Sequence, residues 1–97
     1  LILATNQLVN HLDKFEEMSD GQFKPKVIIR TCIGSRDPLM PGPQHCQNHS
    51  DSFRKMLTNI SVVELTSSSQ IIPVYEGVIK SDKSSIIVEY ADNYNDE

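Results

Sequence analysis

The chain has 97 residues, of which 38% are hydrophobic, and a formal net charge of −4 at pH 7. This length allows one small domain with a single modest core. Its nine basic residues are scattered, which argues against nucleic-acid binding because neutralising phosphates requires clustered Lys and Arg. No apolar run reaches the roughly 18 residues that a membrane-spanning helix needs, so no membrane association is predicted.

The two cysteines, Cys32 and Cys46, are too few for a disulfide framework of the secreted type. We predict that both are reduced thiols and that the chain is cytoplasmic. The N-terminal stretch LILATNQLVNH lacks a basic start and the architecture of a signal peptide. The sequence begins at Leu1 inside an apolar helical pattern with no cap before it, which suggests a fragment or a processed chain.

The first predicted element is a helix over residues 1–18. Its apolar stripe consists of Leu1, Leu8, Leu12 and Phe15, with Ile2 and Val9 beside them. Gly21 suits the left-handed position that ends a helix. After Pro25, the β-branched run KVIIRTCI (residues 26–33) predicts a buried strand.

A loop over residues 34–48 follows, with three prolines and two glycines. Ser50 or Asp51 is expected to cap the next helix. The inward face of that helix is predicted to consist of Phe53, Met56 and Leu57. Asn59 ends the helix, and SVVEL (residues 61–65) predicts the second strand.

Three serines at residues 67–69 suit the start of a third helix, and Pro73 falls in its first turn, where a missing N–H is tolerated. The apolar positions of this helix are Ile72, Tyr75, Val78 and Ile79. A turn at residues 81–84 leads to the third strand, SIIVEY (residues 85–90). The tail ADNYNDE is polar and is expected to fray.

Strands that alternate with helices predict an α/β fold with a parallel sheet and helices on both faces. The predicted order is helix, strand, helix, strand, helix, strand. Three strands form a thin sheet, and parallel sheets normally have cover on both faces and further strands beside them. We therefore expect part of a larger assembly, with apolar surface at Leu1 and Ile2 that promotes homo-oligomerisation.

The segment MPGPQHCQNHS (residues 40–50) concentrates reactive side chains and prolines. It follows the carboxyl end of the first predicted strand, where open parallel sheets bind ligands. Ordered loops of this length are uncommon unless they serve a site. A plain surface connection with solvated histidines explains the same residues equally well.

Three other chemistries are alternatives for this loop. The candidate ligands of a zinc site are His45, Cys46, His49 and Cys32. Structural zinc sites commonly use two ligand pairs, and the second pair is missing here. A nucleophilic Cys46 would need His45 or His49 as its base, but adjacent side chains rarely point at each other. The Arg36-Asp37 pair could bind an anion, although such pairs are generally solvated.

Several stretches match, in this order, the motifs of one family. They are Gln7-Leu8-Val9-Asn10, Met18-Ser19-Asp20-Gly21-Gln22, Ile29-Arg30 and Gly42-Pro43-Gln44-His45-Cys46-Gln47. On these residues the chain resembles the C-terminal part of the pyrimidine-binding (transketolase-like central) domain of thiamine-diphosphate enzymes. It looks most similar to the beta subunit of the first component of 2-oxoacid dehydrogenases. The resemblance covers residues 1–90, and residues 91–97 form a polar tail.

The resemblance implies that the domain holds the aminopyrimidine end of thiamine diphosphate at a dimer interface. An alpha-type diphosphate-binding subunit or domain would hold the diphosphate and Mg²⁺. The parent reaction is decarboxylation of a 2-oxo acid of the pyruvate or branched-chain type, with acyl transfer to lipoamide. His45 would lie near the thiazolium and assist this transfer, since imidazole can donate or accept a proton near neutral pH. Gln44, Gly42 and Pro43 would lie beside it.

The chain departs from the family at the glutamate that activates the cofactor, whose position none of Glu16, Glu17 and Glu89 matches. We therefore expect the chain alone to bind no cofactor and to be catalytically silent. Some relatives bind potassium under the last crossover, where this sequence has Ser81 and Lys83. The ammonium of Lys83 is a candidate replacement for that cation.

Two other functions fit the same residues: a fragment of a transketolase-like two-carbon transferase, or a non-catalytic binding module that kept the fold. A longer upstream reading frame that encodes the glutamate would favour an enzyme. A start codon at or just before Leu1 would favour the module.

Overall fold

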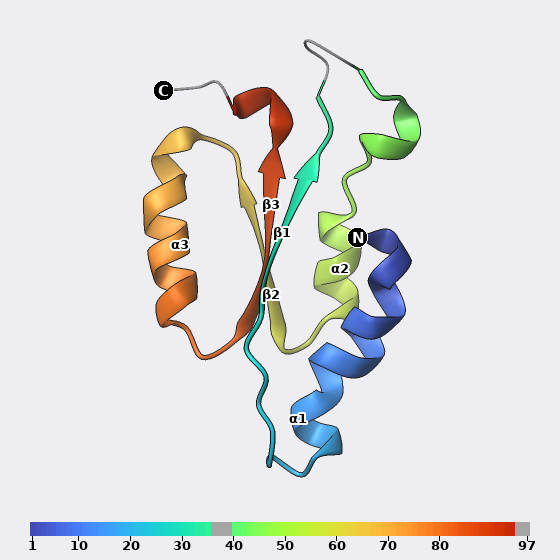
Figure 1. The fold of residues 1–97 in the computed structure, drawn as a ribbon, viewed down its shortest axis with the longest axis vertical. Coiled ribbons are helices and arrows are strands. Elements are labelled where there is room, and N and C mark those ends of the chain that lie inside the picture. The colour runs from blue at the N-terminus through green and yellow to red at the C-terminus, as the bar shows by residue number, and fades with distance from the viewer. Residues whose placement is uncertain (36–39, 95–97) are drawn as a thin grey trace.

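Three parallel strands form one sheet at the centre of the molecule (Figure 1). The structure, a computed structural model, describes residues 1–35 and 40–94, and the side chain of His45 also lies outside this description. The strands are β1 (Ile28–Ile33), β2 (Ile60–Leu65) and β3 (Ser84–Tyr90). Their order in the sheet is β1-β3-β2, so the last strand of the chain lies in the middle. This confirms the predicted α/β fold with a parallel sheet.

The central strand β3 is the most deeply buried element of the described chain. Ile86 and Ile87 are both 0% exposed. Ile86 lies opposite Ile29 of β1 and Val62 of β2 in the parallel register. Because successive side chains of a strand point to opposite faces, Ile86 belongs to one face of the sheet, and Ile87 and Glu89 belong to the other.

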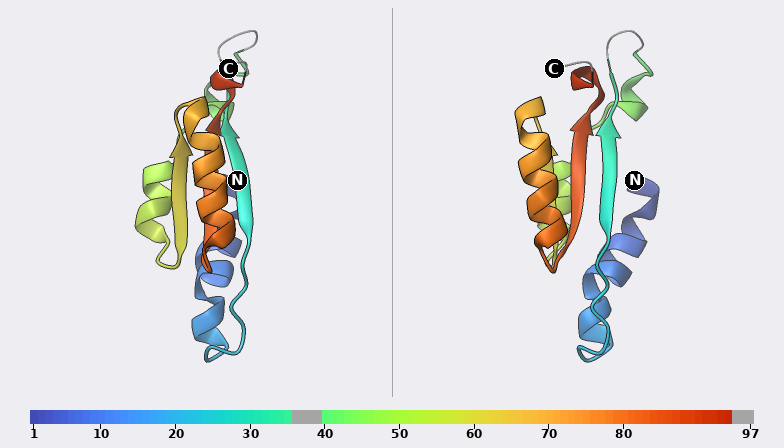
Figure 2. Two further views of the ribbon diagram at one scale, coloured as in Figure 1. Left: turned by 90° about the vertical axis from the view of Figure 1, so that its left-hand side faces the viewer. Right: turned by 60° about the vertical axis from the view of Figure 1, so that its left-hand side comes forward.

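Helices cover both faces of the sheet (Figure 2). The N-terminal helical segment and α2 (Ser50–Met56) lie on the first face. Their core consists of Leu8, Phe53, Leu57, Ile60, Ile86 and Val88. On the second face, α3 (Ile71–Lys80) contributes Val78 to a smaller core with Leu65 and Ile87. Two separate cores therefore share β3.

The predicted N-terminal helix forms, but its geometry is irregular. It runs through the 3-10 turn Ile2–Ala4, the π-helical stretch Gln7–His11, the 3-10 turn Leu12–Lys14 and the short helix α1 (Phe15–Met18). Of its predicted apolar stripe only Leu8 is buried. Leu1 and Ile2 are 41% and 55% exposed, so the expected apolar surface is present. Gly21 adopts φ +76° after the helix, as predicted.

The second helix begins as predicted, but its cap differs. Neither Ser50 nor Asp51 caps it through its side chain; instead the Asn48 side-chain oxygen accepts a hydrogen bond from the Ser50 N–H at 3.0 Å. Phe53 and Leu57 are buried as predicted. Met56 is 41% exposed, so its predicted inward position is wrong.

The third helix starts at a capping box of Ser67 and Gln70, which agrees with the predicted serine-rich start. Val78 is buried and Tyr75 packs against the second core. Ile72 and Ile79 are 69% and 63% exposed, so their predicted inward positions are wrong. The inward row of α3 instead consists of Val74, Tyr75 and Val78, which have the three- and four-residue spacing of one helix face.

The C-terminal tail is more ordered than predicted up to Tyr94. Residues Ala91–Asn93 form a 3-10 turn, and the Tyr94 hydroxyl donates to Glu89 at 3.1 Å. Residues 95–97 lie outside the described chain, as do Arg36 and Asp37. Within the described residues, no helix combines the length and apolar character needed to cross a bilayer.

Asp13 fastens the N-terminal helix to the segment before β2. Its carboxylate is buried and accepts hydrogen bonds from the backbone N–H groups of Thr58 at 3.0 Å and Asn59 at 2.7 Å. The Asn59 amide returns a hydrogen bond to the Asp13 carbonyl at 2.7 Å. Burial alone would raise the pKa of Asp13, but the hydrogen bonds from Thr58, Asn59 and Lys14 together hold it below its ordinary value.

Asp13→Asn is therefore expected to lower the free energy of unfolding by about 2 kcal/mol, because an amide N–H would replace one acceptor oxygen and the charge is lost. Chemical denaturation measures this change. Since folding depresses the pKa of Asp13, its contribution is present above the unfolded value near 4 and disappears as pH falls through the folded value. The variant should thus lose less stability than the wild type on acidification.

Asp51→Asn is the matched control, because the Asp51 side chain is 89% exposed in its ion pair with Arg54. It should change the free energy of unfolding by less than about 0.5 kcal/mol. Equal effects of the two substitutions would show that the hydrogen bonds of Asp13 do not stabilise the contact between the N-terminal helix and the segment before β2.

Candidate functional site

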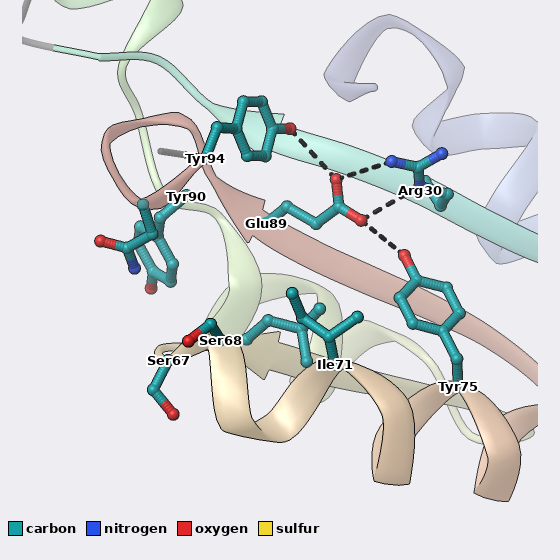
Figure 3. A pocket seen from close by; sticks show the side chains of 10 residues that line it. Arg30, Ser67, Ser68, Ile71, Tyr75, Glu89, Tyr90 and Tyr94 are labelled. Carbon is teal, nitrogen blue, oxygen red and sulfur yellow. Dashed lines mark hydrogen bonds and ion pairs between the residues drawn. The ribbon is translucent and has the colours of Figure 1, made fainter. Parts of the chain in front are cut away.

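Glu89 lies near the carboxyl end of β3, and its carboxylate is the centre of a hydrogen-bond network (Figure 3). Arg30 binds it with two parallel contacts, Nε to Oε2 at 3.0 Å and Nη2 to Oε1 at 3.1 Å. The Tyr75 hydroxyl donates to Oε2 and the Tyr94 hydroxyl donates to Oε1. Each carboxylate oxygen therefore accepts two hydrogen bonds.

The parallel register explains why these side chains meet. Arg30 lies opposite Ile87, which shares a face of the sheet with Glu89 two residues later. Tyr75 belongs to the inward row of α3, which covers the same face. Tyr94 reaches back from the turn after β3. The network thus joins β1, β3, α3 and the C-terminal turn.

The network fixes the charge states of its members. The hydrogen bond from Arg30 lowers the pKa of Glu89 and outweighs the opposing effect of burial, and the two tyrosines lower the pKa further. The hydrogen bond with Glu89 in turn raises the pKa of Arg30. Burial and the hydrogen bond to Glu89 raise the pKa of Tyr94 to about 12, and they also raise the pKa of Tyr75. Glu89 is accordingly an ionised carboxylate at neutral pH.

A cavity of about 380 Å³ opens beside this network. The side chains that matter for its chemistry belong to Arg30, Leu65, Ser67, Ile71, Tyr75 and Tyr94. Figure 3 shows Ile71 and the serines of the α3 start on one side and the Glu89 carboxylate on the other. The cavity therefore combines apolar walls with a few polar groups at one edge of the sheet.

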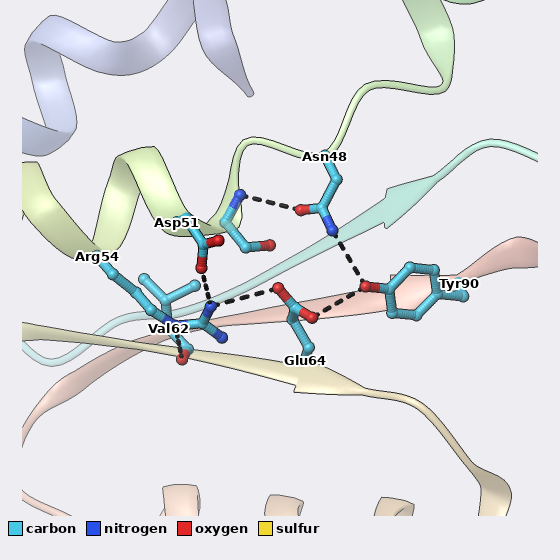
Figure 4. Close-up of polar contacts among 7 residues, drawn as sticks. Asn48, Asp51, Arg54, Val62, Glu64 and Tyr90 are labelled. Atoms are coloured by element: carbon cyan, nitrogen blue, oxygen red, sulfur yellow. Dashed lines mark hydrogen bonds and ion pairs between the residues drawn. The ribbon is translucent and has the colours of Figure 1, made fainter.

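A second carboxylate network lies on the opposite face of the sheet (Figure 4). Glu64 of β2 accepts hydrogen bonds from the Tyr90 hydroxyl at 3.0 Å and from Arg54 at 3.4 Å. The Asn48 amide donates to the same hydroxyl at 3.1 Å. Burial would raise the pKa of Glu64, but the hydrogen bonds from Tyr90, Ser50 and Arg54 lower it below its ordinary value. This network connects the end of the loop that contains His45 (residues 34–48) to the sheet.

The predicted site loop lies beyond the carboxyl end of β1, as the sequence suggested (Figure 1). Gly42, with φ +101°, precedes a 3-10 turn over Pro43–His45. Gln44 lines a cavity of about 230 Å³ against the sheet, together with Gln47, Asn48, Phe53 and Ile86. Only the backbone of His45 is described, so the position of its imidazole stays a prediction.

The other candidate residues are separated. Cys46 Sγ lies 3.6 Å from Met40 Sδ, and His49 Nε2 lies 3.0 Å from the Gln47 side-chain oxygen. Cys32 is on β1 opposite Glu89, and both cysteines are free thiols. Over the side chains that the structure describes, no group of three or more His, Cys, Asp or Glu could hold a metal ion.

Lys83 is exposed in the turn between α3 and β3. Its backbone N–H donates a hydrogen bond to the hydroxyl of Ser81, the other residue of the predicted cation position, at 3.1 Å. The replacement of a bound cation by the Lys83 ammonium stays a prediction.

Sequence reasoning missed the role of Glu89, Tyr75 and Tyr94. A usable signal was present: SIIVEY places an acid in a buried run of apolar residues, and VIIR places an arginine in another. A charge in a buried run requires a partner, so both runs indicated a polar contact inside the sheet, but the pairing of Arg30 with Glu89 follows only from the strand order.

No family model, no curated protein and no solved structure matches this chain.

All three tyrosines of the chain donate to a carboxylate, and the pKa of each is raised, for Tyr90 by burial and by Glu64. We expect Glu89→Gln to move the ring titrations of Tyr75 and Tyr94 down toward the ordinary value near 10. NMR of ring-labelled tyrosine against pH, in the range where the chain stays folded, measures each midpoint. Because folding raises these values, stability should fall as pH rises through them.

Glu64→Gln is the matched control for this experiment, because Glu64 accepts from Tyr90 alone among the tyrosines. It should lower the Tyr90 midpoint and leave the other two in place. A wild-type Tyr94 that titrates near 10 in the folded chain would contradict the network.

Proposed function

We propose that this chain forms part of the pyrimidine-binding domain of a thiamine-diphosphate-dependent 2-oxoacid dehydrogenase, of the pyruvate or branched-chain type. The observation that carries the proposal is the location of Gly42-Pro43-Gln44-His45-Cys46-Gln47 in the loop that follows the carboxyl end of the parallel strand β1. Ligands of open parallel sheets bind at this edge. The order of the family motifs along the sequence is the second support.

The cavity at Gln44 suits one ring of the cofactor. The side-chain amides of Gln44, Gln47 and Asn48 offer hydrogen-bond donors and acceptors, and Phe53 and Ile86 offer apolar contact. Its volume of about 230 Å³ is below the roughly 300 Å³ at which pockets for whole drug-sized ligands begin. The described residues therefore fit the aminopyrimidine end but not the complete cofactor.

Thiamine diphosphate, when bound, would supply the chemistry that the decarboxylation of a 2-oxo acid requires. Within the proposal, His45 holds or moves a proton near the substrate carboxylate and the acyl group. Gln44 orients the loop beside it. As the resemblance implies, the diphosphate and Mg²⁺ are assigned to an alpha-type subunit or domain. Catalysis would then require this partner and the family's activating glutamate.

A cytoplasmic location belongs to the same proposal. Its support is that Cys32 and Cys46 are both free thiols, the state that reducing compartments maintain. Homo-oligomerisation also belongs to it, supported by the exposed apolar side chains of Leu1, Ile2 and Leu3.

The proposal is tested in the product of the complete reading frame. The sequence upstream of the Leu1 codon is expected to encode a segment with the activating glutamate. In that protein, combined with its diphosphate-binding partner, His45→Ala should lower the rate of acyl transfer to lipoamide by about 10²–10⁴-fold, the usual contribution of a positioned acid or base. Steady-state kinetics with a 2-oxo acid measure this loss.

His11→Ala is the control, because His11 is exposed on the N-terminal helix, and it should leave the rate unchanged. A start codon immediately before Leu1 would contradict the enzyme and favour a binding module. Equal rates for His45→Ala and the wild type would contradict the role of His45.

The chain of 97 residues is expected to give no heat of binding when thiamine diphosphate and Mg²⁺ are titrated into it. Isothermal titration calorimetry measures this directly. Saturable binding that His45→Ala weakens would contradict the divided site, because the chain would then hold the cofactor without a partner.

A further inference from the structure

The cavity beside Glu89 has the size and lining of a small-molecule site. Its volume of about 380 Å³ falls within the roughly 300–1,000 Å³ of ligand pockets. Leu65 and Ile71 and the rings of Tyr75 and Tyr94 provide apolar walls. Like the Gln44 cavity it lies toward the carboxyl ends of the strands, but on the opposite face of the sheet.

The members of the Glu89 network that line this cavity differ in the hydrogen-bond capacity that they have left. Both oxygens of Glu89 already accept two hydrogen bonds, so no acceptor site of the carboxylate is left for a ligand cation. The hydroxyl protons of Tyr75 and Tyr94 are used in the same contacts. Arg30 is different: its two hydrogen bonds to Glu89 use Nε and Nη2 and leave Nη1 outside this contact, and its side chain is 67% exposed.

Arg30 is also held in place before any ligand arrives. Its Nε and Nη2 groups bind Glu89 in a forked arrangement, which fixes the plane of the guanidinium at the rim of the cavity. A guanidinium fixed in this way loses less conformational entropy on binding than a mobile one. Its outer edge can then donate to a carboxylate while the apolar part of the ligand contacts the tyrosine rings.

We propose that this cavity binds a small organic carboxylate with a flat apolar body, with the carboxylate on the outer edge of Arg30 and the apolar body between Ile71, Tyr75 and Tyr94. The site does not depend on the function proposed for His45. It uses the α3 face of the sheet, whereas the His45 loop and Gln44 belong to the α2 face.

Benzoate is the probe, with benzylamine as a ligand of similar size and opposite charge and acetate as a carboxylate without a ring. Titration of each into the ¹⁵N- and ring-labelled chain is followed by NMR. Benzoate should bind saturably and shift the Arg30 Nε–H and Tyr94 ring signals. Acetate should bind at least about tenfold more weakly, because the apolar contacts are lost, and benzylamine should not shift these signals.

Two variants and a control assign the binding to this cavity. Arg30→Lys keeps the charge but loses the fork, and should weaken benzoate binding by about tenfold. Arg54→Lys is the matched control, because Arg54 binds Glu64 and Asp51 on the opposite face, and it should leave binding unchanged. Ile71→Trp should fill the cavity and abolish binding, and the 45% exposure of Ile71 leaves room for the larger ring without disturbing the core.

Three outcomes would overturn the proposal. They are the absence of saturable benzoate binding, benzylamine binding as tight as benzoate binding, and equal effects of Arg30→Lys and Arg54→Lys. The amide spectra of all variants report whether each is folded. Loss of binding in a folded Ile71→Trp chain supports the site, and retention of binding in that chain would overturn it.

Discussion

The burial of β3 between two parallel neighbours is the constraint on which the rest of the structure depends. Residues 84–89 are all buried, so this strand needs side-chain partners on both faces of the sheet. Ile86 and Ile87 each stabilise the fold by about 1.5–3 kcal/mol through burial alone. Their alternation divides the interior into two cores and requires a helical layer on each side. It also decides which face every later polar residue of the strand must join.

This alternation places Glu89 on the face of the sheet that α3 covers. A buried carboxylate is tolerated there because residues of β1, α3 and the C-terminal turn donate hydrogen bonds to it. A buried, unpaired charge costs several kcal/mol, whereas charge-assisted hydrogen bonds to each oxygen offset this penalty. Arg30 is largely exposed, so its ion pair contributes less than a fully buried one would. The tyrosine hydroxyls exclude water from the remaining acceptor sites. Among the described residues no buried side-chain polar atom lacks a partner.

The sequence predicted the features that local periodicity determines. The β-branched runs located the three strands, the three serines at residues 67–69 located the start of the third helix, and alternation of strands with helices predicted the parallel sheet. Errors arose where the face of a helix depends on its docking: Ile72 and Ile79 belong to the apolar pattern of α3 but lie outside its contact with the sheet. Contacts such as Arg30–Glu89, between residues 59 positions apart, depend on the strand order, which periodicity does not encode.

The networks around Glu64 and Glu89 lie near the C-terminal ends of the strands, and they serve either the stability of the fold alone or also the positioning of binding groups. Ion pairs with an exposed partner contribute little to stability, and Arg30 and Arg54 are 67% and 42% exposed, so stability alone gives little reason to keep Glu64 and Glu89 near the ends of β2 and β3. Both carboxylates orient groups that face a cavity or a loop. Glu64 acts through Tyr90 on Asn48, which lies at the end of the predicted site loop, and Glu89 fixes Arg30 at the rim of the larger cavity. This arrangement favours a role in holding binding groups in position, on each face of the sheet independently.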